Sequence, residues 1–317
     1  MVGMDGVLII DKPAGMTSHD VVARVRKITG HRRVGHTGTL DPFATGVLVV
    51  LVGGATRLAQ FLSGAEKEYE AVIRLGYATD TGDIAGVRIE KESLAKAQST
   101  QSFGKEEVEA ALASLRGEIE QTPPMYSAKK VGGRKLYELA RRGEEIEREP
   151  VRVNINEFET LWHDGVLTPN GDGNHDLRVR VVCSAGTYIR TLAEDFGKKL
   201  GVGAHVAELR RTRAGEFKIA DALTLDRLSE AARSGSLDQV LISPDAALSH
   251  LPVKELTLDD ARRVGQGIDL QIEEASAPPW ANGQAVRLRN TVGRLIAVGI
   301  YDGERKIVHP QVVIVNA

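Results

Sequence analysis

The order of strand-like and helix-like segments constrains the fold of this chain more than any other feature of its sequence. Apolar or alternating runs at residues 6–11, 47–52 and 67–75 predict strands, as do the β-rich segments 151–161 and 177–184. Residues 105–115 and 187–200 predict helices. Because this order is mixed and lacks a strict strand–helix–strand repeat, it favours an α+β fold. We expect a mostly antiparallel central sheet with flanking helices.

The first 50 residues contain one further helix and a loop. Residues 17–20 offer helix caps ahead of apolar positions with helical spacing, and Gly30 is a suitable stop. Residues 34–45 are rich in Gly, Thr and Pro and show no periodicity, so we expect them to form a loop.

The apolar pattern restarts near residues 243–253, which indicates a second domain in this chain of 317 residues. A helical stretch at 258–264 and strand-like runs at 285–288, 295–301 and 312–315 follow. We therefore expect a large domain over residues 1–245 and a small β-rich domain over residues 251–317. The polar stretches 93–104 and 163–176 look like insertions in the large domain.

Composition argues against several classes of protein. The single cysteine, Cys183, cannot form an internal disulfide framework, and the eight histidines are scattered outside any metal-binding motif, so we expect no metal. The N-terminus lacks the pattern of a signal peptide, and the longest apolar run, residues 47–52, is far too short to span a membrane. We expect a cytoplasmic protein that is not associated with a membrane.

Basic residues are clustered although the net charge is only -2. One such cluster alone is typical of a solvated face, but three in a slightly acidic protein indicate segregated charge, which binding to a phosphate backbone requires. Gly132 and Gly133 make us expect a mobile middle cluster. The clusters are Arg24, Arg26, Lys27, His31, Arg32, Arg33 and His36; Lys129, Lys130, Arg134, Lys135, Arg141 and Arg142; and Arg210, Arg211 and Arg213.

Residues 32–46 hold the densest group of unusual residues. Asp41 precedes Pro42, which favours an extended backbone, and lies in a Gly-rich segment beside an apolar strand. A carboxylate held there could act as a nucleophile or base, although the same pattern is typical of a simple turn. A phosphate-binding loop is excluded because the segment lacks the Gly-Lys-Ser/Thr ending and precedes a strand.

Two tyrosines and one arginine are further candidates. Tyr69 lies on a predicted strand, and Tyr188 and Arg190 lie at a strand-to-helix junction. They are either core or rim residues, or groups that stack on a flipped base and pair with a carboxylate.

Several blocks, in order, resemble the tRNA pseudouridine-55 synthase family of the TruB type. They span about two thirds of the chain, from Gly6 to Gly215. The blocks are Gly6 to Ser18 with Lys12-Pro13; Gly35-His-Thr-Gly-Thr-Leu-Asp41-Pro to Leu48; Lys67-x-Tyr69; Leu75 to Asp83; Thr122-Pro-Pro-Met-Tyr-Ser-Ala-Lys129; Gly186-Thr-Tyr188-Ile-Arg190; and Gly203 to Arg211.

This resemblance implies a pseudouridine synthase fold and a role for each matched residue. Asp41 would be the catalytic carboxylate, acting at the sugar C1′ or by removing a proton, and the base would rejoin the ribose through C5 without cofactor or metal. Arg190 would pair with Asp41. The other implied substrate-binding residues are Tyr69, which would stack on the flipped uracil; Tyr188, at the base; Leu209, on the apolar side; His36, in the space left by the base; and Lys12 and Asp83, whose roles are undefined.

The resemblance also implies an RNA substrate, the T-arm of tRNA. Residues 121–143 would form an RNA-gripping thumb, with Lys129, Lys130, Arg134, Lys135, Arg141, Arg142, Arg210 and Arg211 as RNA contacts. The C-terminal part would be a PUA-like appendage, and the protein would act as a monomer without a protein partner. Two alternatives stay open: a guide-RNA-dependent pseudouridylase, and an RNA chaperone that acts by binding alone.

Overall fold

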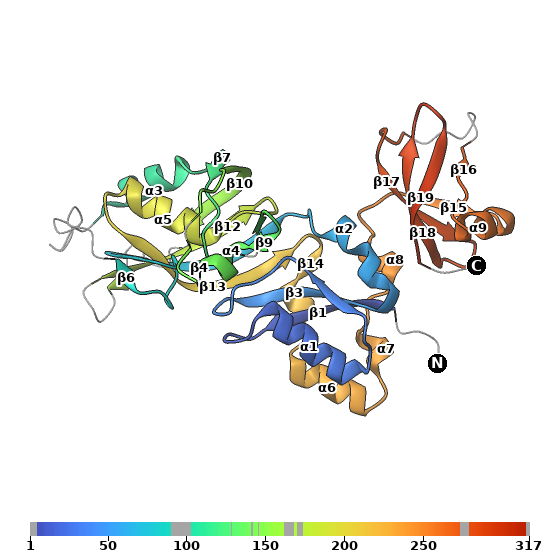
Figure 1. Cartoon of the computed structure of the whole chain (residues 1–317), viewed down its shortest axis with the longest axis horizontal. Helices are drawn as coiled ribbons and strands as arrows, with labels where there is room; N and C mark the ends of the chain where they lie inside the picture. The colour runs from blue at the N-terminus through green and yellow to red at the C-terminus, as the bar shows by residue number, and fades with distance from the viewer. Residues whose placement is uncertain are drawn as a thin grey trace.

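The computed structural model describes residues 5–89, 103–127, 129–140, 142–144, 146–161, 168–169, 174–272 and 279–314. These residues form a ten-stranded sheet with helices packed on it and a separate five-stranded sheet near the C-terminus. In Figure 1 the large sheet occupies the left and middle of an elongated molecule, and the small sheet lies at its upper right. The predicted α+β class, with a mostly antiparallel central sheet, is confirmed.

The large sheet has one long path of seven strands, which pair antiparallel except where β3 meets β13. Strands β2 (Val34–Thr37), β11 (Thr168–Pro169) and β14 (Phe217–Lys218) pair off this path. In spatial order the path is β1 (Gly6–Lys12), β3 (Thr45–Val52), β13 (Ala204–Ala214), β4 (Lys67–Leu75), β12 (His175–Cys183), β10 (Val151–Thr160) and β7 (Gly117–Gln121).

One face of this sheet carries the main core. Helices α1 (Ser18–Thr29), α3 (Lys105–Ala113), α5 (Ile189–Lys199) and α6 (Leu225–Arg233) contribute buried side chains to it. The opposite face of β1 and β3 is covered by η1 (Gly53–Leu58), α2 (Ala59–Leu62) and α8 (Pro244–Ala247). Burial on both faces explains why these two strands read as unbroken apolar runs.

The ends of α1 follow local sequence chemistry. The Thr17 side chain accepts from the backbone N–H of Asp20, and the Asp20 carboxylate accepts from the backbone N–H of Thr17, which is a capping box. Gly30 ends the helix with a φ of 70°, in the left-handed region that glycine adopts without a steric cost. The predicted caps of this helix are confirmed.

The sequence prediction missed several strands, of which β2 and β13 lie next to the residues singled out above. Residues 34–37 were expected within a loop, but they form β2 because they pair antiparallel with β3, Val34 opposite Val52 and His36 opposite Val50. Strand β13 was considered only for its charge, yet it lies between β3 and β4 in the middle of the sheet. Its arginines hide the apolar alternation that would otherwise have identified a strand.

The C-terminal sheet has its own core and also packs against the large one. Its strands are β15 (Val253–Leu256), β17 (Ala285–Asn290), β18 (Leu295–Asp302), β19 (Ile307–Val313) and β16 (Leu270–Gln271), with α9 (Leu258–Gly265) against them. Leu295, Val298 and Val312 join the apolar cluster under β1 and β3. The last strand begins at residue 307, earlier than the predicted 312.

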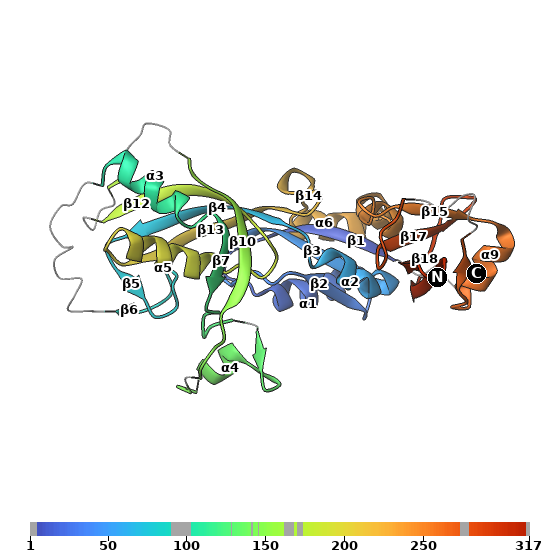
Figure 2. The ribbon, with the colours of Figure 1, turned by 90° about the horizontal axis from the view of Figure 1, so that it is seen from above.

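Small elements extend from the edges of the large sheet. The hairpin of β8 (Lys130–Val131) and β9 (Arg134–Lys135) turns at Gly132 and Gly133, which both have positive φ. Helix α4 (Leu136–Ala140) follows it and stands out beyond β7 and β10 (Figure 2). The remaining short elements are β5 (Ala78–Thr79), β6 (Arg88–Ile89), η3 (Ile219–Asp221) and α7 (Leu237–Val240). Among the described residues, no helix is long and apolar enough to cross a membrane.

Candidate active site

A cavity of about 250 Å³ lies where strands β4 and β13, the start of α5 and the loop after β2 meet the base of the thumb. It brings together five residues that the sequence analysis singled out from four separate segments, namely Asp41, Tyr69, Tyr188, Arg190 and Leu209. Ser127 and Lys129 line it from the thumb. The cavity is therefore the natural candidate for the active site.

Asp41 and Arg190 form an ion pair at this cavity. The Nε atom of Arg190 lies 3.0 Å from one carboxylate oxygen of Asp41, and Nη2 lies 3.3 Å from the other. Arg190 is almost fully buried, with 5% of its side chain exposed, whereas Asp41 retains 31% on the side that faces the cavity. The arginine is thus the fixed partner, and the carboxylate is open to a ligand.

Every terminal nitrogen of Arg190 has a further partner. Nη1 donates to the carbonyl of Thr81 at 2.8 Å and to the carboxylate of Asp83 at 3.4 Å, and Nη2 donates to the carbonyl of Tyr126 at 2.7 Å. The guanidinium therefore lies between two carboxylates, of which Asp83 is the more buried.

The pKa of the Asp41 carboxyl is raised above its ordinary value. Burial is the main cause, the Arg190 guanidinium opposes it, and the negative charge of Asp83 adds to the rise. A carboxylate with a raised pKa is a stronger base than an exposed aspartate. Arg190 limits the rise and fixes the orientation of the group.

The backbone around Asp41 is held from several sides. The carbonyl of Pro42 accepts from the backbone N–H of Gly15 at 2.8 Å, and the Ser18 hydroxyl exchanges hydrogen bonds with the backbone of Leu40. Gly46 approaches the backbone of Arg211 so closely that a Cβ would lie 2.2 Å from its carbonyl oxygen, so no other residue fits there.

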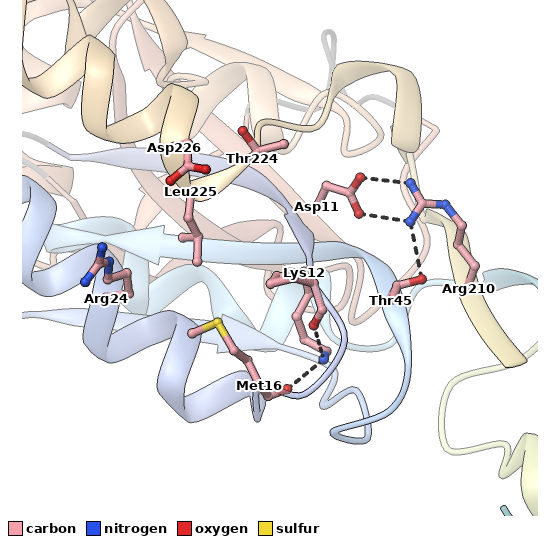
Figure 3. A pocket seen from close by; sticks show the side chains of 10 residues that line it. Asp11, Lys12, Met16, Arg24, Thr45, Arg210, Thr224, Leu225 and Asp226 are labelled. Carbon is pink, nitrogen blue, oxygen red and sulfur yellow. Dashed lines mark hydrogen bonds and ion pairs between the residues drawn. The ribbon is translucent and has the colours of Figure 1, made fainter. Parts of the chain in front are cut away.

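Lys12 supports this loop from beneath. It is fully buried, and its ammonium donates to the carbonyls of Pro13, Met16 and Pro42 at 2.9, 2.7 and 3.3 Å. Figure 3 shows its side chain folded back toward Met16. Burial lowers the pKa of Lys12 to about 8, while Asp41 opposes that change. Lys12 therefore ties the turn between β1 and α1 to the loop that carries Asp41.

Tyr69 and Tyr188 present aromatic rings to the cavity. Tyr69 comes from β4 and is 8% exposed, and Tyr188 stands directly before α5. Burial raises the pKa of both phenols, so both hydroxyls stay neutral at neutral pH. Leu209 of β13 adds an apolar surface. A flat, mostly apolar ring can be held between such groups.

Arg211 was predicted to contact RNA, but the structure places it inside the protein. It is 1% exposed, and it donates from Nε to the carbonyl of Val47 at 2.7 Å and from Nη2 to the carbonyl of Gly38 at 3.0 Å. A side chain buried in this way lines the cavity and braces the loop that carries Asp41, and it does not lie on the surface.

Arg210 points the other way and forms a bidentate ion pair with Asp11 at 2.8 and 3.1 Å. Figure 3 shows this pair at the edge of a second cavity, of about 590 Å³, beside Thr45. Its side chain is 40% exposed, so Arg210 stays accessible.

His36 lies on β2 and is not among the residues that line the candidate active-site cavity. Its ring makes an edge contact with His19, with 5.5 Å between ring centres, and its Nδ1 atom is buried without a hydrogen-bond partner. Burial lowers the pKa of His36 to about 4. The ring is therefore neutral at neutral pH.

The thumb residues are described unequally. Lys129 lines the cavity, and Arg134 and Arg142 are exposed. Lys130 and Lys135 are described by their backbone alone, and Arg141 lies outside the described residues. Most of the stretches 93–104 and 163–176 also lies outside them.

Two buried polar residues at the site were assigned no individual role in the sequence analysis. Lys67 donates to the carbonyls of Ser63 and Ala65, and burial lowers its pKa to about 8. Gln121 is fully buried at the end of β7 and contacts the backbone of Tyr188. The alternation of Ile119 and Gln121 on one face of a strand is the signal that could have revealed Gln121.

Among the described residues, no group of three His, Cys, Asp or Glu side chains could hold a metal ion. The chemistry that this site offers is that of one basic carboxylate, a paired guanidinium and two neutral phenols.

Two family models together match residues 26–249. One described as "TruB family pseudouridylate synthase (N terminal domain)" covers residues 26–189, and another described as "tRNA pseudouridylate synthase B C-terminal domain" covers residues 190–249. Asp41, Tyr69, Tyr188 and the thumb lie within the first match, and Arg190 begins the second.

Curated relatives and solved structures agree with these matches. A "tRNA pseudouridine synthase B" of Geobacillus thermodenitrificans is 47% identical over 85% of this chain and 86% of its own length, and one of Bacillus anthracis is 44% identical over 87% and 88%. The archaeal box H/ACA sRNP Nop10–Cbf5 complex contains a chain of 26% identity and TM-score 0.70 that aligns with 98% of this chain and 86% of its own. A chain of a Cbf5–Nop10–Gar1 complex is 28% identical with a TM-score of 0.73, and the alignment covers 98% of this chain and 85% of that one.

Proposed function

This chain belongs to the TruB family of pseudouridylate synthases, and on that premise we propose that it isomerises uridine 55 in the T-arm of tRNA to pseudouridine. The observation that carries the proposal is the Asp41–Arg190 ion pair, which faces a cavity flanked by Tyr69, Tyr188 and Leu209. A uracil ring fits between these groups, with its ribose beside the carboxylate. The relatives named tRNA pseudouridine synthase B support the substrate class.

The chemistry needs one carboxylate and no electron carrier. The bond between N1 and C1′ breaks, the base turns, and a bond between C5 and C1′ forms. The proton that leaves C5 is balanced by the one that N1 gains, so the reaction is an isomerisation without net oxidation or hydrolysis. Asp41 starts it either by attack on C1′ or by removing a ribose proton, and its raised pKa favours both roles.

The other side chains each have a part in this scheme. Arg190 holds Asp41 in place and ionised, and Asp83 holds Arg190 from its other side. Tyr69 stacks on the uracil, Leu209 packs against it, and Tyr188 contacts the base near C5. Lys12 fixes the backbone of the loop that carries Asp41.

The target uridine must leave its stack to reach Asp41, which costs a few kcal/mol. Stacking on Tyr69 and phosphate contacts from the thumb and from the exposed Arg210 offset that cost. His36 lies outside the cavity in the free protein, and we assign it to the space that the flipped base leaves in the RNA.

We favour a protein that acts alone on tRNA as a monomer over one that depends on a guide RNA. Curated relatives of 44–47% identity are named as tRNA enzymes, whereas the chains found in H/ACA complexes are 26–28% identical. Binding that remodels tRNA without modification is a second proposed activity, supported by the accessible basic side chains of Arg134, Arg142 and Arg210, which lie outside the catalytic cavity.

A T-arm hairpin incubated with the pure protein and no additive tests the proposal. We expect one pseudouridine, at position 55, by mass spectrometry or chemical mapping. A hairpin with cytidine at that position is the matched control and should remain unmodified. The proposal fails if the wild-type protein leaves the hairpin unchanged, and a requirement for a protein or guide-RNA partner would favour the alternative.

A further inference from the structure

Gln121 is the most deeply buried neutral polar side chain at the candidate active site, with no measurable exposure. It is the last residue of β7 and the first residue of the thumb, which spans residues 121–143. A primary amide placed so deeply must satisfy its donors and acceptor within the protein, because leaving them unpaired is costly. The identity of its partners therefore indicates what the residue does.

Both ends of the Gln121 amide bind the same residue. Its oxygen accepts from the backbone N–H of Tyr188 at 3.0 Å, and its nitrogen donates to the carbonyl of Tyr188 at 3.3 Å. Tyr188 stands at the N-cap of α5 without a side-chain cap, and its carbonyl also accepts the first helical hydrogen bond, from Leu192. The peptide groups on both sides of Tyr188 are thus fixed by one side chain from another element.

The segment that leads into Tyr188 is tied down at its start, where Ser184 and Asn154 exchange two hydrogen bonds and the Thr187 hydroxyl donates to the Ser184 carbonyl, and Gln121 is the anchor at its end. This segment is a short connection from β12 that contains Gly186 in the left-handed region, with a φ of 87°. A Cβ at Gly186 would meet no atom within 4 Å, so the connection is not packed against neighbours there. The two hydrogen bonds from Gln121 fix the backbone of Tyr188, where packing around Gly186 does not.

The same stretch of chain contacts Arg190 as well. Five residues after Gln121, the carbonyl of Tyr126 accepts from Nη2 of Arg190 at 2.7 Å. The base of the thumb therefore holds two of the groups that surround the substrate cavity, Tyr188 through its backbone and Arg190 through its guanidinium.

We propose that Gln121 is a positioning residue for catalysis, which places the Tyr188 side chain in the cavity and ties it to the root of the thumb. This inference rests on the proposed function. Gln121 does not line the cavity, so it would act on the substrate only through Tyr188. Its loss should slow the chemical step and leave RNA affinity unchanged, since a small displacement of a group at the reacting centre is costly in rate.

The test compares Gln121→Met, which keeps the volume but cannot hydrogen-bond in the same way, with the wild type on a T-arm hairpin. We expect the single-turnover rate to fall on the order of tenfold or more, with the dissociation constant changed less than about threefold. Gln284→Met is the matched control. Gln284 accepts from the backbone N–H of Ala281 in the C-terminal domain, and its variant should keep the wild-type rate.

A double-mutant cycle with Tyr188→Phe separates positioning from a merely structural role. If Gln121 acts by placing the Tyr188 hydroxyl and ring, the two rate losses combine to less than their product. Losses that multiply, a wild-type rate in Gln121→Met, or a loss confined to RNA affinity would each overturn the inference. If thermal unfolding shows that Gln121→Met is not folded, Gln121→Asn replaces it in the same cycle. An inactive wild type would instead refute the proposed function itself.

Discussion

Arg190 and Arg180 are both surrounded by carboxylates, yet they lie in opposite environments. Arg190 is 5% exposed and pairs with Asp41 and Asp83 beneath the cavity. Arg180 of β12 is 32% exposed and pairs with Glu68, Glu157 and Glu159 on the outer face of the same sheet. The difference is therefore one of solvation and not of residue chemistry.

Depth determines what each cluster can do. Water screens the outer charges, so that cluster contributes little to stability and keeps the sheet face hydrated. In the buried cluster, desolvation raises the pKa of Asp41, and the guanidinium is needed to keep the carboxylate charged. Reactivity is concentrated where charges are costly to bury.

The largest effect on activity is expected from removing the negative charge of Asp41 in the buried cluster. Asp41→Asn keeps the shape of the side chain but removes its ability to act as nucleophile or base. We expect pseudouridine formation in a T-arm hairpin to fall by roughly 10³-fold or more, with binding retained, because the carboxylate enters the chemistry itself. Mass spectrometry and filter binding measure the two quantities. A variant that still converts uridine would remove Asp41 from the mechanism.

The second effect tests the buried arginine through stability. Arg190→Met leaves Asp41 and Asp83 without the guanidinium that lies between them. Breaking a buried ion pair on one side costs about 3–5 kcal/mol of unfolding free energy. Urea denaturation at neutral pH measures it, and activity should be lost in the same variant. A loss of unfolding free energy below about 1 kcal/mol would show that the buried ion pairs contribute no more to stability than exposed ones do.

Much of this arrangement could be predicted from the sequence, because apolar alternation and helix caps are local signals. Strands β1, β3 and β4 and the caps of α1 follow from such signals. Asp41 and Arg190, 149 positions apart, were paired through family resemblance, since no local signal joins residues so distant.

What could not be predicted depends on the direction of single side chains. Arg210 and Arg211 are neighbours on β13, and the strand pleat sends one toward Asp11 and the other into the protein. Both were expected to contact RNA because charge alone does not show on which face of a strand a residue lies. The alternation with Ile119 could have shown that Gln121 faces inward, but no local signal indicates its partner, a backbone group 67 positions away in sequence.

Asp83 offers a smaller and more specific test of the buried cluster. Its negative charge raises the pKa of Asp41, so Asp83→Asn should lower that pKa. Activity requires ionised Asp41 and is lost as the pH falls through its pKa. The acid limb of the profile of kcat/KM against pH should therefore move to lower pH in the variant. An unchanged limb, or one moved to higher pH, would contradict this electrostatic assignment.

His36 extends the comparison to a buried basic group without an ionic partner. Its pKa is about 4 in the folded protein, below the ordinary 6.5, so the unfolded chain binds the proton first as the pH falls. Stability is fully present above 6.5 and declines between 6.5 and 4. In His36→Asn the free energy of unfolding should fall less steeply between pH 6.5 and 4 than in the wild type, as measured by urea titrations at several pH values. The exposed His250→Asn is the control and should retain the wild-type slope.

The smallest effect is expected on the outer face of the sheet. Arg180→Met removes the guanidinium that bridges three glutamates, as Arg190→Met removes one that bridges two aspartates. Here water solvates the remaining carboxylates, so we expect a stability loss of at most about 1 kcal/mol and a wild-type rate of modification. The loss of stability should shrink further at about 1 M salt, where charges more than about 3 Å apart are largely screened from each other. A cost as large as that of Arg190→Met would mean that shared charge, and not burial, governs both clusters.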